Sequence, residues 1–185
     1  MGKISTIWDT LKDMYHRQIT PPLQYARELG VTIGEDNFLP DKRCWSSEPY
    51  LIKVGSHCQI TVGVRFFTHG GGHVVREQYP HFDTFGKIVI GDWVYIGNNS
   101  LIMPGVTIED HVLVAAGSVV TKSVPAGMVV GGNPAHIICT IDEYLERNKQ
   151  FNTETKSKPG INKKDILMSM KDEYFIKKPY LTKNA

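Results

Sequence analysis

The stretch from Ile88 to Val124 constrains the fold most, because its apolar residues recur every six positions. Neither a helix (period 3.6) nor an ordinary strand (period two) produces this step. The main register contains only β-branched residues, which suit strands packed from one side: Ile90, Ile96, Ile102, Ile108, Val114 and Val120. Turn-prone pairs such as Pro104-Gly105 separate the register positions. Short strands punctuated by turns at a fixed period predict a β-solenoid.

A six-residue step also predicts which residues stack. Three hexads, about 18 residues, complete one triangular coil, so Ile90 should lie over Ile108. In the same way, Ile96 should lie over Val114 and Ile102 over Val120. Gly91 and Gly97 follow register residues, where we expect the chain to bend sharply. In an antiparallel sheet connected by hairpins, apolar residues would instead recur every two positions, and the loops would vary in length.

The rest of the chain predicts extensions and one insertion. Residues 1–30 should form an N-terminal helical cap, residues 31–140 the solenoid domain, and residues 141–185 a C-terminal helical extension. Residues 40–50 fit no register and are expected to be a surface loop. Residues 67–87 interrupt the repeat with three histidines and three consecutive glycines. A long polar interruption of a solenoid is usually a functional loop.

Composition excludes few functions but indicates a compartment. A net charge of +2 over 185 residues gives no argument for a nucleic-acid partner. Cys44, Cys58 and Cys139 are odd in number and lack C-x-x-C spacing, so we expect reduced thiols. The sequence contains no membrane-span candidate, and we predict no export signal. These features favour a cytoplasmic protein.

Several motifs follow one another in a specific order: a Thr-His pair in the insertion, then the repeats, then SVVTKSVP and GGNPA. With these motifs, residues 31–144 resemble the left-handed β-helix acyltransferases, in particular maltose/galactoside O-acetyltransferases and capsule or O-antigen sugar acetyltransferases. The resemblance implies a left-handed parallel β-helix, acetyl-CoA as cosubstrate, a sugar acceptor and no metal. It also implies a homotrimer whose active sites lie between subunits.

The resemblance further assigns candidate site residues. It makes His69 the catalytic base and places Tyr95 at the family's aromatic position. His73, four residues after His69, and Trp93, beside Tyr95, are further candidates for substrate binding. Residues matching the family's coenzyme A contacts are Asn98, Ala116, Thr121 and Lys122. Two departures concern the ligands: His136 and Cys139 stand near the position where relatives often carry a cation, and Gly70 stands where close relatives often carry an acid.

Histidine suits the expected chemistry, because a sugar hydroxyl is a poor nucleophile and needs a base whose pKa lies near neutral pH. No nucleophilic serine or cysteine signature is present, which favours direct transfer over a covalent acyl-enzyme. The group that orients His69 stays open among Glu77, Asp83 and a backbone carbonyl.

Other functions also remain open. Serine or xenobiotic acetyltransferases share the expected fold. Zinc carbonic anhydrases also share it, but they need three histidines that converge across a subunit boundary, whereas His69, His73 and His81 all lie in one loop. A solenoid scaffold without catalytic activity is the non-enzyme alternative.

Overall fold

The computed structural model describes residues 14–156, 162–180 and 182. They form two compact units, which divide after Ile141. The first unit contains every strand, and the second contains short helices. The first 13 residues of the expected N-terminal helical cap lie outside the described residues.

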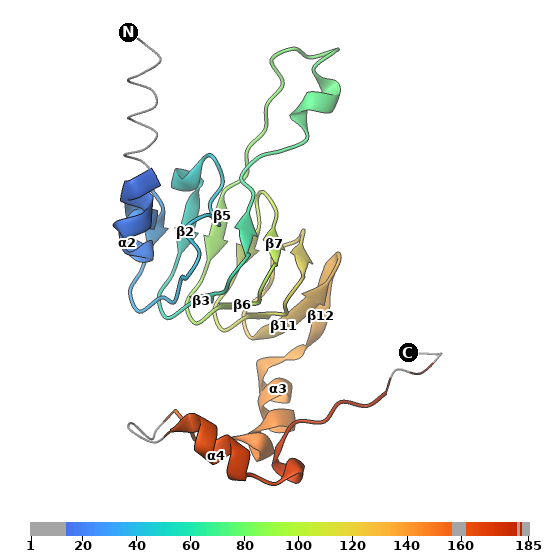
Figure 1. Ribbon diagram of the computed structural model, residues 1–185. Helices are drawn as coiled ribbons and strands as arrows, with labels where there is room; N and C mark the ends of the chain where they lie inside the picture. Colours follow the sequence, from blue (N-terminus) through green and yellow to red (C-terminus); the bar gives the residue numbers. More distant parts are fainter. Residues whose placement is uncertain (1–13, 157–161, 181, 183–185) are drawn as a thin grey trace. The chain divides into compact units, whose positions relative to one another are not determined.

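The strands of the first unit form three sheets, and the chain visits these sheets in turn (Figure 1). Sheet A contains β1 (Thr32–Ile33), β2 (Ile52–Val54), β5 (Ile88–Ile90) and β8 (Thr107–Ile108). Sheet B contains β3 (Gln59–Ile60), β6 (Tyr95–Ile96), β9 (Leu113–Val114), β11 (Met128–Gly132) and β12 (Ala135–Thr140). Sheet C contains β4 (Arg65–Phe66), β7 (Leu101–Ile102) and β10 (Val119–Val120). All neighbouring strands are parallel except β11 and β12.

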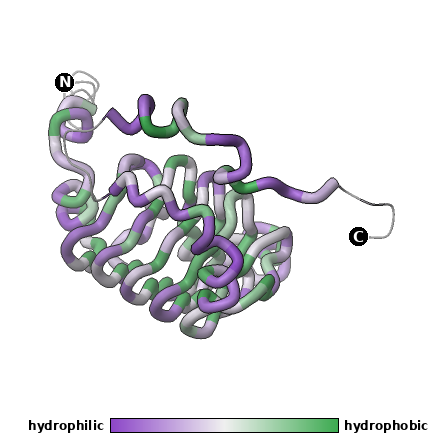
Figure 2. Tube along the Cα trace, turned by 90° about the horizontal axis from the view of Figure 1, so that it is seen from below, coloured by the Kyte–Doolittle hydropathy of each residue, from purple (hydrophilic) through white to green (hydrophobic). Residues whose placement is uncertain are grey.

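The register confirms the stacking predicted from the six-residue step. Ile90 pairs with Ile108, Ile96 with Val114, and Ile102 with Val120. The inward side chains of these strands are buried and form one continuous core. Figure 2 shows the successive coils lying side by side. Sheets A, B and C are therefore the three sides of a parallel solenoid.

The coil glycines are needed for close packing between coils. The backbone φ angles of Gly91 and Gly97 are not positive, whereas Trp93, Asn99 and His111 at the following turn positions have φ of 55 to 60°. A Cβ on Gly97 would lie 2.5 Å from the backbone nitrogen of Ala116. The expected sharp bend is thus made by the residue two positions later, and the glycine allows the next coil to approach.

The expectation of a surface loop over residues 40–50 is right for most of the segment, which is irregular and at least partly exposed, but it missed the burial of Cys44 and Pro49. Cys44 is fully buried in the core, and its carbonyl accepts a hydrogen bond of 2.9 Å from the amide of Phe66. The indole of Trp45 stacks on the ring of Phe66, with centroids 5.3 Å apart. This segment therefore lies along β4 and completes the first coil.

Short helices lie at both ends of the sequence. In the first unit, α2 (Pro22–Glu28) precedes the first strand, and Val31 donates to the carbonyl of Ala26. The second unit holds α3 (Ile141–Asn148), η3 (Lys149–Phe151), α4 (Lys163–Ser169) and η4 (Asp172–Tyr174). None of the side chains described in these four helices is buried. Within the described part of the chain, no helix is long and apolar enough to cross a membrane.

Candidate active site

The 67–87 insertion leaves the solenoid at the corner between sheets C and A and has a narrow, paired base (Figure 1). Gly86 donates a 2.7 Å hydrogen bond to the carbonyl of Thr68, and His69 forms an antiparallel bridge with Phe85. The imidazole of His69 also contacts the Phe85 ring, with centroids 5.7 Å apart. His69 is therefore held at the junction of a rigid strand and the loop, and the loop tip does not set its position.

A carboxylate orients His69. Oε2 of Glu48 lies 2.7 Å from Nδ1 of His69, and the Glu48 side chain is only 16% exposed. Because an ionised carboxylate only accepts hydrogen bonds, Nδ1 carries the proton in the neutral ring. The Nε2 lone pair is then available as a base, which is the arrangement general-base catalysis requires.

Two hydroxyl groups hold this carboxylate in turn. Oγ1 of Thr68 lies 2.6 Å from Oε2 of Glu48 and 2.7 Å from Oγ of Ser46. Thr68 has one hydroxyl proton, so it donates to Glu48 and accepts from Ser46. The hydrogen bond from Thr68 is the largest cause that holds the pKa of Glu48 below its ordinary value, with the hydrogen bond from His69 adding to it. Glu48 is therefore a carboxylate at neutral pH.

A hollow of about 370 Å³ opens beside His69. Its lining comes from the segment before β2 and from the end of β4: Trp45, Ser46, Ser47, Arg65, Phe66, Phe67 and His69. Nε1 of Trp45 is buried without a hydrogen-bond partner. The volume lies in the range of small-ligand sites, and the lining combines aromatic rings, hydroxyl groups and one guanidinium.

The predicted coenzyme A residues lie along the two edges of sheet C. Thr121 and Lys122 follow β10 at the corner between sheets C and A, where His69 follows β4 two coils earlier. Asn98 and Ala116 lie at the corner between sheets B and C, where Gly117 donates a 2.8 Å hydrogen bond to the Asn98 carbonyl. The outward positions of sheet C between these corners include Leu101 and Val119, both partly exposed. An apolar strip thus runs between two rows of candidate residues.

The remaining candidates do not share the His69 corner. Tyr95 lies in β6 and is 38% exposed on sheet B. Trp93 lies at the corner between sheets A and B, where its ring stacks on the His57 ring, with centroids 4.5 Å apart. His73 lies on η2 (Gly72–Val75), the single 3₁₀ turn within the insertion, and is exposed. In one chain, neither Tyr95 nor Trp93 is brought next to His69.

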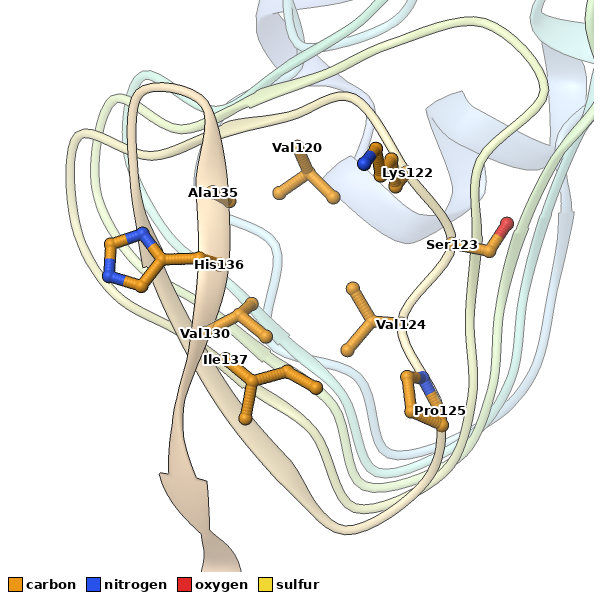
Figure 3. A pocket seen from close by; sticks show the side chains of 9 residues that line it. All are labelled: Val120, Lys122, Ser123, Val124, Pro125, Val130, Ala135, His136 and Ile137. Carbon is orange, nitrogen blue, oxygen red and sulfur yellow. The ribbon is translucent and has the colours of Figure 1, made fainter.

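The solenoid ends in a second hollow of about 260 Å³, which lies under the β11–β12 hairpin (Figure 3). Lys122 and His136 both line it, together with the apolar side chains of the last coil. Cys139, by contrast, is buried in β12 opposite Val129. Of the two residues noted after GGNPA, only His136 can therefore reach a ligand from this end.

The sequence did not point to Glu48, Trp45 or Arg65. Asp83, which the sequence offered as a residue to orient His69, instead faces Arg76, with its Oδ1 3.9 Å from Nη2 of that arginine. Glu48 lies 21 positions before His69, in the segment without a register, and only the pairing of that segment with β4 brings the two together. Across the residues with described positions, no group of three or more His, Cys, Asp or Glu side chains could hold a metal ion.

Comparison with known proteins identifies relatives of this chain. The family model described as bacterial transferase hexapeptide (six repeats) matches residues 87–122. Protein CapG of Staphylococcus aureus is 48% identical over 145 residues, which cover 77% of this chain and 84% of CapG. Galactoside O-acetyltransferase of Escherichia coli (strain K12) is 30% identical over 135 residues, which cover 72% of this chain and 64% of that enzyme.

Solved structures give the same result. A hexapeptide-repeat-containing acetyltransferase of Vibrio cholerae O1 biovar eltor, complexed with acetyl coenzyme A, aligns with a TM-score of 0.52 and 31% identity over 60% of each chain. A galactoside acetyltransferase in complex with coenzyme A aligns with a TM-score of 0.50 over 72% of this chain and 79% of that chain. Its identity of 23% supports the fold alone.

Proposed function

Because the chain belongs to the hexapeptide-repeat transferase family and is an acetyltransferase, we propose that it transfers the acetyl group of acetyl-CoA to a sugar hydroxyl. The observation that carries this proposal is the Glu48–His69 pair beside the hollow lined by Trp45 and Arg65. The similarity to a galactoside O-acetyltransferase supports a sugar acceptor. A role in surface polysaccharide synthesis is the part of the proposal that rests on the resemblance to capsule and O-antigen sugar acetyltransferases. We place the reaction in the cytoplasm and infer that the solenoid is left-handed, as in hexapeptide acetyltransferases.

In the proposed mechanism, transfer is direct. Nε2 of His69 takes the proton of the acceptor hydroxyl while that oxygen attacks the thioester carbonyl carbon. The carbon–sulfur bond then breaks, and the imidazolium returns the proton to the coenzyme A thiolate. Glu48 stabilises the imidazolium formed between these two steps, because it accepts the hydrogen bond from Nδ1. A backbone N–H at a coil turn would stabilise the oxyanion, a contact of about 3 kcal/mol.

Coenzyme A fits along sheet C in this proposal. The pantetheine arm would lie on the partly exposed apolar side chains Leu101 and Val119, between Asn98 and Ala116 on one corner and Thr121 on the other. Lys122, which lines the end hollow together with His136, would bind a phosphate of the coenzyme as a compact point charge. The acetyl end would then reach the His69 corner.

The geometry of one chain supports a shared site. In a three-sided coil the corner between sheets C and A faces away from the outer surface of sheet B, on which Tyr95 lies. Tyr95 can therefore serve a reaction at His69 only if it belongs to a second copy. We propose a homotrimer in which neighbouring subunits complete each site, with Tyr95, Trp93 and His73 as candidate acceptor contacts.

The test is His69→Ala, assayed by coenzyme A release on a panel of sugars, free serine and a chloramphenicol-type drug. We expect kcat on accepted sugars to fall by about 10²–10⁴-fold, the contribution of a general base. His81→Ala, an exposed histidine in the same insertion, is the matched control and should keep full activity. Unchanged coenzyme A release in His69→Ala would contradict the proposed base. Transfer to serine or to the drug but to no sugar would contradict the proposed acceptor.

A further inference from the structure

Two arginines lie side by side on the outer surface next to His69. The hydrogen bond between the Phe66 amide and the Cys44 carbonyl aligns the segment before β2 with β4. Arg43 and Arg65 lie on these two neighbouring segments, next to the paired residues. Both side chains are exposed, and the Arg65 guanidinium donates to the Arg43 carbonyl.

No carboxylate neutralises this pair within the described ranges. Neither guanidinium makes an ion pair of 4.0 Å or less there. The Glu48 carboxylate is occupied by His69 and Thr68, and Oδ1 of Asp41 accepts the backbone N–H of Arg43 at 2.8 Å. Like charges held on neighbouring segments repel each other. An uncompensated pair beside a catalytic base therefore indicates a site for an anion.

The positive charge continues away from the base. Arg65 and His69 line the same hollow, and Arg43 lines a third hollow of about 390 Å³, in which Arg17 and Lys42 outnumber the single carboxylate of Asp41. The Lys42 ammonium donates to the carbonyls of Arg17 and Gln18, which fixes its position. A cationic surface thus begins within the hollow at His69 and extends toward the N-terminal end of the solenoid.

We propose that the acceptor sugar carries an anionic group, and that Arg65, with Arg43 beside it, binds that anion and so directs one hydroxyl toward Nε2 of His69. The anion is a phosphate on the sugar, as in a glycosyl phosphate, or a carboxylate, as in a uronic acid. A guanidinium binds both through paired N–H donors. This inference rests on the proposed function and specifies its substrate class.

The test compares matched acceptors on the full-length chain. Methyl hexosides, the corresponding hexose 1-phosphates and the corresponding hexuronic acids are assayed with wild type, Arg65→Gln, Arg65→Lys and Arg43→Gln. Lys53→Gln removes one exposed charge from sheet A and is the control. We expect wild type to prefer the phosphate or the carboxylate series, and whichever series it prefers identifies the anion.

Arg65→Gln should lower kcat/KM for the preferred anionic series by about 10- to 100-fold, the range of a charge-assisted hydrogen bond. It should change the neutral series less than about threefold. Arg65→Lys should retain part of the preference, Arg43→Gln should show a smaller loss, and Lys53→Gln should show none. Inorganic pyrophosphate should inhibit wild type competitively against the acceptor, and Arg65→Gln should relieve this competition with the acceptor.

Equal use of neutral and anionic acceptors, or equal losses on both in Arg65→Gln, would overturn the anion site and leave the proposed sugar acetyltransferase standing. Transfer to none of the sugars, with coenzyme A release on serine or on the drug, would overturn the proposed function and this inference with it.

Discussion

The Glu48–His69 pair brings together two residues that lie far apart in sequence. Residue type and the Thr-His motif were enough to single out His69, because histidine is the side chain whose pKa suits a base at neutral pH. Its partner could not be predicted, because Glu48 lies in a segment without repeats. The nearby acids that the sequence offered were Glu77 and Asp83, and the structure instead supplies Glu48 through the pairing of residues 43–48 with β4.

Glu48→Gln tests the positioning role. The amide keeps the size of the side chain but removes the charge that stabilises the imidazolium, so kcat should fall about 10- to 100-fold, as for other residues that orient a reacting group. KM for acetyl-CoA should stay constant, and the pH profile of kcat should change, which a purely structural residue would not cause. Glu77→Gln is the matched control on an exposed acid of the insertion. Equal kinetics and pH profiles in both variants would contradict the role.

Acid should weaken the same network. The folded-state pKa of Glu48 lies below its unfolded value because Thr68 and His69 hydrogen-bond to the carboxylate. Such a group stabilises the fold at pH values above the unfolded pKa of about 4.3, and this contribution is lost as pH falls through the folded-state pKa. The difference in free energy of unfolding between wild type and Glu48→Gln should therefore be largest near pH 7. It should shrink below about pH 4 in urea titrations, and a difference that stayed constant with pH would contradict this linkage.

At the scale of the elements, the six-residue step predicted the coils well and the irregular parts poorly. A fixed period determines which residues stack, so the pairing of Ile90 with Ile108 follows from counting. The first coil keeps this step only from Ile33 to Leu39, and Cys44 and Trp45 then occupy its core in place of β-branched residues. Buried residues that do not recur at a fixed spacing cannot be recognised by counting along the sequence.

Gly97→Ala tests the close approach of neighbouring coils. The added Cβ would meet the backbone of Ala116 at 2.5 Å, and a backbone neighbour can move only with its whole coil. We expect a loss of about 1–3 kcal/mol in free energy of unfolding, typical of overpacking. Gly70→Ala is the control, because its Cβ meets nothing within 4 Å, and it should change stability by less than about 0.5 kcal/mol. Equal denaturant midpoints for the two variants would show that the coils separate easily.

At the scale of the whole molecule, a solenoid with three outer faces distributes the candidate site residues around its circumference. Counting hexads predicts this distribution, because it places each residue on a given side or corner. It does not predict which side meets a neighbouring molecule, since that depends on outward side chains and on an insertion that follows no repeat. Tyr95 on sheet B and His69 at the opposite corner can meet only between two copies.

Mixing two inactive variants tests this arrangement. The His69→Ala and Tyr95→Ala proteins are denatured, mixed in equal amounts and refolded together. Each variant is also denatured and refolded alone as a control. If one subunit supplies His69 and its neighbour supplies Tyr95, random assembly gives both native residues in about a quarter of the sites, one half multiplied by one half. The mixture should then recover about a quarter of wild-type kcat per site, well above either variant alone. If the activity of the mixture is no higher than the mean of the two variants refolded alone, His69 and Tyr95 do not complement each other. That result would contradict a site shared between His69 of one subunit and Tyr95 of another.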